Sequence, residues 1–148
     1  MQIAAADLLC TFCTQQHGTL NELFEFALAR LSLPTTPPIE VKVLLLVIAI
    51  VRDNAKERAD IHKSLKGYLD TQLPTLLQPV TSQDELIVRS LKLYVLHKYN
   101  LFLSQVDQNY LSVTAQLALT IIQTPSLRDD QVLQIIALDI LANICDIG

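Results

Sequence analysis

The 148-residue sequence contains no tryptophan, one methionine and three glycines, and aromatic residues make up only 5% of it. Scarce glycine alongside abundant Leu, Ile and Ala disfavours β-hairpins and favours helices. No segment alternates apolar and polar residues with a period of two for long enough to predict a strand. The expected fold class is therefore all-α.

Charge is also sparse. Charged residues make up 18% of the chain and the net charge is −4, which argues against a nucleic-acid partner. No basic segment opens the chain, so we expect no secretory signal. The three cysteines are an odd number without a paired disulfide pattern, which favours a reducing compartment. The expected location is intracellular, either cytoplasmic or nuclear.

Long hydrophobic runs are missing as well. The longest is Val43–Val51, nine residues, whereas a membrane-spanning helix needs roughly 20. Yet 51% of the residues are hydrophobic and the mean hydropathy is +0.35, which is high for a free domain of this size. We expect helices buried on several sides and apolar end faces. Another chain, additional native sequence or self-association would cover at least one such face.

What the sequence does contain is an internal repeat. The stretch Glu40–Ala55, EVKVLLLVIAIVRDNA, recurs 45 positions later as ELIVRSLKLYVLHKYN and after 45 more as DQVLQIIALDILANIC. The apolar positions that stay in register are Val43/Val88/Leu133, Leu46/Leu91/Ile136, Ile48/Leu93/Leu138, Ile50/Val95/Ile140 and Val51/Leu96/Leu141. A fixed period of this length indicates a solenoid. We expect one domain over residues 1–148, a module of a longer protein, with repeats of about 1–53, 54–98 and 99–148.

Periodicity and capping residues predict the individual helices. Thr19 with Glu22, and Ser82 with Glu85, have the spacing of capping boxes, and Ser126 with Asp129 caps the last helix. The segments expected to be helical are 3–15, 19–32, 39–53, a short solvated helix 54–65 closed near Gly67, a helix reaching 78, then 84–98, 109–123 and 127–144. Residues 100–104 are expected to form a connector. The core should include Leu46, Ile48, Leu91, Leu93, Ile136 and Leu138.

Residues 54–98 resemble an armadillo repeat, the three-helix relative of the HEAT repeat. The matching residues are Asn54, Arg58, Ile61 and Gly67, then LPTLLQ at 73–78 and a core helix ending in LYVLHK at 93–98. The last repeat matches the core pattern better, with ALDILANI at 137–144. The resemblance implies a right-handed superhelix of about three three-helix repeats. Armadillo is favoured, and HEAT remains the alternative.

The resemblance also implies a binding site. In armadillo families the third helix of each repeat lines a concave groove, where an Asn holds the peptide backbone and a Trp one turn earlier packs on the peptide. Only Asn143 matches that Asn, and the Trp position holds Ala49, Tyr94 and Asp139. This departure argues against a nuclear-import-receptor type of function. The candidate partner-binding residues are Asp53, Tyr94, Lys98, Asp139 and Asn143, and ordinary polar surface is the alternative.

Other reactive side chains do not form a recognisable site. Cys10 and Cys13 form a CxxC with His17 nearby, but the βαβ context of a redox motif and the fourth ligand of a zinc site are missing. We interpret both cysteines as buried small hydrophobes. His62 and His97 lack a nucleophile motif and are expected on the surface. The basic residues between 52 and 66 alternate with acids, which indicates a solvated, salt-bridged face.

We therefore expect no catalytic residue, metal or cofactor, and interpret the chain as a non-catalytic protein–protein interaction scaffold. It would bind a partner peptide, helix or subunit through its concave groove or an apolar end face. One alternative is a HEAT-like, nucleic-acid-associated subunit of a larger complex. A second is an enzyme or thiol-redox module that uses Cys10 and Cys13.

Overall fold

A computed structural model describes residues 19–78, 80 and 82–147. The helix predicted over 3–15, with Cys10, Cys13 and His17, lies outside these residues. The described part of the chain is all-helical and contains no strand, which confirms the predicted all-α class. No described helix is long and apolar enough to cross a membrane.

Within the described residues, six α-helices and three short 3₁₀ segments follow one another. The α-helices are α2 (Thr19–Leu31), α3 (Pro38–Ile50), α4 (Ala59–Gln72), α5 (Gln83–Val106), α6 (Tyr110–Gln123) and α7 (Gln131–Ile147). The 3₁₀ segments are η1 (Val51–Ala55), η2 (Leu73–Leu77) and η3 (Pro125–Leu127).

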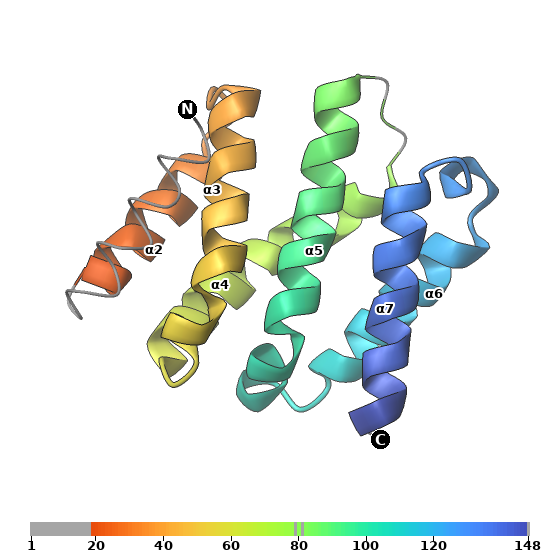
Figure 1. Cartoon of the computed structure of the whole chain (residues 1–148). Coiled ribbons are helices and arrows are strands. Elements are labelled where there is room, and N and C mark those ends of the chain that lie inside the picture. The colour runs from red at the N-terminus through yellow and green to blue at the C-terminus, as the bar shows by residue number, and fades with distance from the viewer. Residues whose placement is uncertain (1–18, 79, 81, 148) are drawn as a thin grey trace.

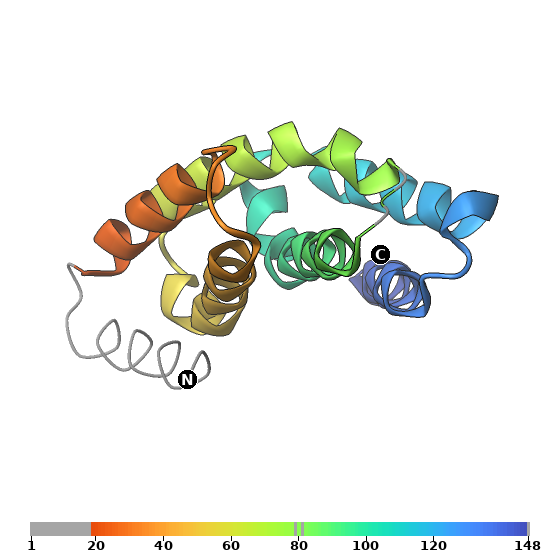
Figure 2. The same cartoon turned by 90° about the horizontal axis from the view of Figure 1, so that it is seen from above.

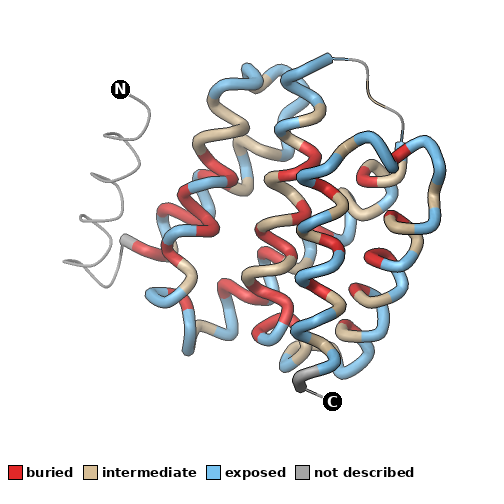
Figure 3. Tube along the Cα trace, turned by 45° about the vertical axis from the view of Figure 1, so that its right-hand side comes forward, coloured by how far each residue is buried: buried red, intermediate tan, exposed pale blue. Residues whose placement is uncertain are grey.

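The helices form two layers. In Figure 1, α3, α5 and α7 stand side by side and run in the same direction, from the top of the view to the bottom. Seen from above, α2, α4 and α6 form a second, arched layer behind them (Figure 2). The long helix α5 is central, because it packs against α3, α4, α6 and α7. Buried positions gather on the sides of the helices that face one another (Figure 3).

Local chemistry explains where two of the front helices begin. The Ser82 hydroxyl accepts a hydrogen bond from the Glu85 backbone N–H at 3.1 Å, so the cap predicted for α5 is confirmed. The cap predicted for the last helix is wrong, because Ser126 lies inside η3 and α7 begins only at Gln131. Instead, Oδ1 of Asp130 accepts a hydrogen bond from the Leu133 N–H at 3.1 Å, and α7 begins after Asp130.

The division of residues 54–104 also differs from the prediction. The two helices expected between 54 and 78 are one helix, α4, followed by η2, and Gly67 lies inside α4. A single glycine costs a helix only about 1 kcal/mol, and buried Leu65 and Leu69 on either side anchor it. The expected connector at 100–104 belongs to α5, where Phe102 and Leu103 are buried. Over the described residues 59–147, each 45-residue stretch of sequence thus contains two α-helices and a short 3₁₀ segment, not the three helices expected.

The predicted core is partly confirmed. Ile48 and Leu93 are fully buried, and Leu91 and Ile136 are half-buried against the core. Leu46 and Leu138 are exposed, contrary to the prediction. Leu138 shares its register with Ile48 and Leu93, but α7 is the last described helix of the array (Figure 1) and no further described helix covers it.

His62 is buried rather than solvated, with 2% of its surface exposed. Its Nε2 lies 2.7 Å from the Ala55 carbonyl oxygen, and its ring stacks on Phe102 with the ring centroids 4.9 Å apart. The Arg52 guanidinium lies 4.7 Å from the centroid of the same Phe102 ring. The prediction failed because the apolar partner of His62 comes from the part of α5 that was expected to be a connector.

Candidate functional site

Tyr94 and Lys98 lie one turn apart on α5 and contact each other. The Lys98 Nζ is 5.3 Å from the centroid of the Tyr94 ring, within the range of a cation–π interaction. Both side chains are only half-buried. The two residues therefore present a combined aromatic and cationic surface, as their i, i+4 spacing predicted.

Asp139 and Asn143 are exposed on the neighbouring helix α7, again one turn apart. Burial lowers the pKa of His97, on α5 next to Lys98, and the nearby Asp139 carboxylate partly opposes that shift. The charge of Asp139 therefore acts across the boundary between α5 and α7. Asn143 lies one turn further along α7 than Asp139.

Asp53 joins this region indirectly. It is exposed in η1 and forms an ion pair with Arg52, whose Nη1 lies 3.1 Å from the Asp53 Oδ1. The Nε of Arg52 donates a hydrogen bond to the Lys98 carbonyl oxygen at 2.5 Å. Arg52 therefore links Asp53 to the backbone of α5, but Asp53 is held at the η1 side and not beside α7.

Of the basic residues between 52 and 66 that were expected to form a salt-bridged face, Arg52, Arg58 and Lys66 form ion pairs in the structure. Besides the Arg52 pair, Arg58 lies 3.7 Å from Asp60, and Lys66 lies 2.8 Å from Asp70 one turn along α4. Exposed pairs of this kind contribute roughly 0–1 kcal/mol each.

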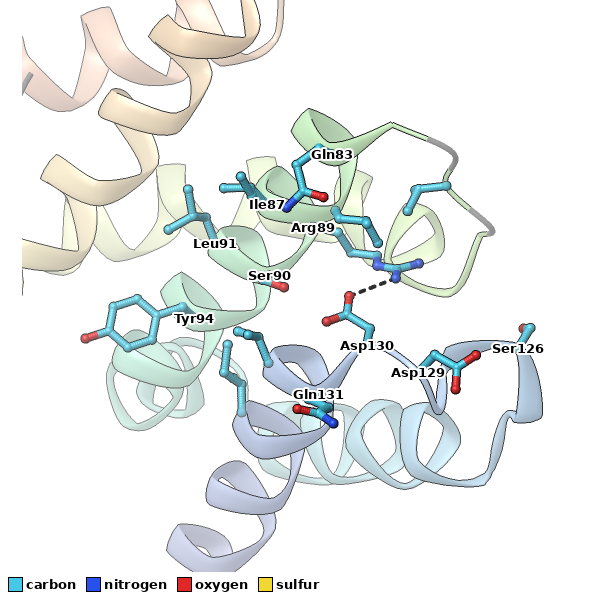
Figure 4. Close-up of a pocket in the computed structure, with 14 residues that line it drawn as sticks. Gln83, Ile87, Arg89, Ser90, Leu91, Tyr94, Ser126, Asp129, Asp130 and Gln131 are labelled. Carbon is cyan, nitrogen blue, oxygen red and sulfur yellow. Dashed lines mark hydrogen bonds and ion pairs between the residues drawn. The ribbon is translucent and has the colours of Figure 1, made fainter.

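A hollow of about 640 Å³ lies between α5 and α7, and sequence reasoning missed it. Its α5 wall includes Ile87, Leu91 and Tyr94 (Figure 4). Its α7 wall includes Val132 and Ile136. The α5 residues are spaced i, i+4 and i+7, so they form one stripe along the helix. We call this hollow the α5–α7 groove. Its volume is in the range of ligand-binding pockets in proteins.

A buried ion pair closes one end of the groove. Arg89 is 5% exposed, and its Nη2 lies 3.0 Å from Oδ2 of Asp130, across the groove from α5 (Figure 4). Its Nη1 donates a hydrogen bond to the Gln78 carbonyl oxygen at 2.9 Å. Because Asp130 also caps α7, this one pair fixes α5, the residue after η2 and α7 relative to one another. The exposed side chain of Asp129 lies on the rim beside it.

The 45-residue register contained the signal for this groove. It matches Ile87 with Val132, Leu91 with Ile136, Tyr94 with Asp139, and Lys98 with Asn143. The polar candidates are the last two pairs of this series. The first two pairs are the apolar walls of the groove, and they were overlooked because Leu91 and Ile136 were assigned to the core.

Among the described residues, no group of three or more His, Cys, Asp and Glu side chains is placed to hold a metal ion. In comparisons with protein-family models, curated proteins and solved structures, nothing matches this chain.

Proposed function

We propose that this protein is a non-catalytic interaction scaffold that binds a segment of a partner protein on the exposed face of α3, α5 and α7. The observation that carries the proposal is the α5–α7 groove, whose apolar walls continue into Tyr94, Lys98, Asp139 and Asn143. An apolar strip with a few polar groups at its edge is typical of surfaces that bind peptides or helices.

We further propose that the array is an α-solenoid of the armadillo and HEAT type. The sequence period of 45 residues and the placement of one helix in each layer per period support this. In the described residues from α4 to α7, each period holds two α-helices rather than three, which favours HEAT over armadillo. Solenoids characteristically offer extended surfaces for other chains.

The contacts of the charged side chains in the groove support a binding role rather than a catalytic one. Arg89 and Asp130 are the buried charged pair, and both side chains are engaged in holding helices together. Tyr94 and Lys98 contact each other at the surface, where an aromatic ring offers a rigid contact of the kind enriched at interaction hot spots. The free, exposed Cys145 thiol fits our proposal of an intracellular location.

A double variant, Tyr94→Ala with Lys98→Glu, tests the proposed function. Partners captured by affinity pull-down and identified by mass spectrometry supply the ligand, and calorimetry gives its affinity for both proteins. We expect the double variant to bind the partner at least tenfold more weakly, a loss of about 1.4 kcal/mol. Both side-chain contacts with the partner are removed, and the charge at position 98 is reversed. A Glu25→Lys variant, on α2 in the other layer, is the matched control and should bind normally.

The thermal melt of the double variant should stay close to that of the wild type, because the two side chains are only half-buried. Normal partner binding by a folded double variant would contradict binding at Tyr94 and Lys98.

A further inference from the structure

We propose that the α5–α7 groove binds one amphipathic helix of a partner protein, which inserts apolar side chains between the two walls and places a Lys or Arg beside Asp129. This inference rests on the proposed scaffold function. It specifies the chemistry of the partner segment and the part of the surface that anchors it.

The walls of the groove have the spacing of a helix-binding site. Ile87, Leu91 and Tyr94 form a stripe on α5, and Val132 and Ile136 form a stripe on α7. Both stripes are incompletely covered: Val132 is 57% exposed and Ile87 is 37% exposed. A helix with apolar residues at i, i+3 or i+4, and i+7 would fill the space between two such stripes and bury them.

The charges around the groove indicate which charge a bound partner segment should carry. The positive charge of Arg89 is neutralised by Asp130 at 3.0 Å. Further along the two helices, Lys98 on α5 and Asp139 on α7 carry one formal charge of each sign. Asp129 remains on the rim, and in the described part of the chain it forms no ion pair. Of the residues that line the groove, Arg89, Asp129 and Asp130 are charged, so the lining has one negative charge in excess at this end, which favours a partner with a basic side chain there. The exposed Arg128 next to Asp129 does not line the groove.

The order of these features along α7 fixes the pattern expected in the partner. Asp129 comes just before α7, Val132 lies in its first turn, and Ile136 lies one turn later. A basic residue that pairs with Asp129 must therefore lie at one end of the apolar stripe of the partner helix, and not in its middle. When the partner helix covers Val132 and Ile136, it also excludes water from the rim. This strengthens the ion pair between Asp129 and the basic side chain of the partner.

Peptide selection against the whole chain tests the proposal, with random peptides in place of the natural partner. A phage library of random 16-residue peptides is panned on the immobilised protein, and the tightest peptide is labelled for fluorescence anisotropy. We expect the enriched sequences to share apolar residues at helical spacing and at least one Lys or Arg beside them. Val132→Asp and Asp129→Lys should each weaken binding of that peptide more than tenfold.

Two controls make the result specific. Glu25→Lys, in the hollow between α2 and α4, reverses a charge away from the groove and should leave the affinity unchanged. Changing the basic residue of the peptide to Glu should restore binding to Asp129→Lys, because the charges are then complementary again. Val132 and Asp129 are exposed, so thermal melts of both variants should match the wild type.

Each contrary outcome has a distinct meaning. Enriched peptides that ignore both groove variants would overturn this inference and leave the scaffold function standing. Peptides that bind in the groove but have no basic residue would overturn the assignment of the partner. A dimer dissolved by Val132→Asp in analytical ultracentrifugation would assign the groove to a second copy of this chain and overturn the inference. A library with no enriched peptide would count against the scaffold function itself.

Discussion

At the scale of single residues, Arg89 does more to hold the described helices together than any other charged side chain described. It joins α5 to the Gln78 carbonyl and to Asp130, which also caps α7. Removing one partner of a buried ion pair leaves the other charge buried without compensation, which typically costs about 3–5 kcal/mol. Sequence reasoning did not identify Arg89, because its partners lie 11 and 41 residues away.

We therefore predict that Arg89→Ala lowers the free energy of unfolding by about 3–5 kcal/mol, measured by urea denaturation. Asp129→Ala is the matched control: it removes an exposed carboxylate next to Asp130 and should change stability by less than about 0.5 kcal/mol. Similar stabilities for the two variants would show that the Arg89 pair does not hold the helices together.

His97 predicts how the stability of the protein depends on pH. Burial lowers its pKa below 6.5 in the folded protein, with Lys98 and Arg52 acting in the same direction and Asp139 opposing them. The unfolded chain therefore takes up this proton first as the pH falls. The contribution of His97 to stability is fully present above pH 6.5 and is lost as the pH falls through 6.5 toward the folded pKa.

Urea unfolding at a series of pH values between about 5 and 8, on both sides of the ordinary histidine pKa, checks this prediction. The wild type should lose stability more steeply than His97→Gln as the pH falls, because glutamine cannot take up a proton. Equal slopes for the two proteins would mean that His97 titrates alike in the folded and unfolded chains.

At the scale of helices, the sequence predicted where helices exist better than which face each one buries. The repeat and the capping residues located α2, α3, α5 and α6 to within a few residues at the N-terminal end. In α3, apolar residues occupy every side of the helix, so periodicity could not separate buried Ile48 from exposed Leu46. The same ambiguity at Leu91 and Ile136 concealed the groove, because both residues look like core until their neighbours are placed.

The polar half of the candidate site was easier to predict than the apolar half. Tyr94 with Lys98, and Asp139 with Asn143, share faces through their i, i+4 spacing alone. The contribution of Arg52 was not predictable, because its hydrogen bond to the Lys98 carbonyl joins η1 to a helix 46 residues away. Where an interaction depends on the packing of distant elements, a single sequence carries no direct signal for it.

Leu93 and Leu138 give a matched test of how the helices pack, because they occupy the same position one period apart. Leu93 is 0% exposed and Leu138 is 55% exposed. We predict that Leu93→Ala costs about 2–5 kcal/mol, while Leu138→Ala costs less than about 1 kcal/mol, since an exposed side chain leaves no cavity. Equal losses in denaturant unfolding would mean that Leu138 is also buried in solution.

At the scale of the whole molecule, the outer side of α7 remains open. Ile135 and Leu138 are both more than half exposed there, on a different side of the helix from the groove residue Ile136. α7 is the last described helix of the array, and no described helix lies beyond it (Figure 1). Apolar stripes of this kind mark surfaces where another chain packs.

We predict that the isolated chain self-associates through this surface and that Ile135→Glu with Leu138→Lys reduces the association, measured by sedimentation equilibrium over a range of concentrations. Val113→Glu, another exposed apolar residue but on α6, is the control and should associate like the wild type. A wild-type chain that remains monomeric at high concentration would contradict the prediction, as would a double variant that associates unchanged.

The open, two-layered arrangement has a mechanical consequence. The first and last described helices, α2 and α7, lie at opposite ends of the array (Figure 1). Each front helix therefore packs only against its neighbours. Small rotations between successive helices would add up along such an array, so we expect the molecule to bend along its length. Bending changes the separation of α5 and α7. A partner helix bound between α5 and α7 would make the array stiffer. Tension along the array would in turn weaken the binding of that helix.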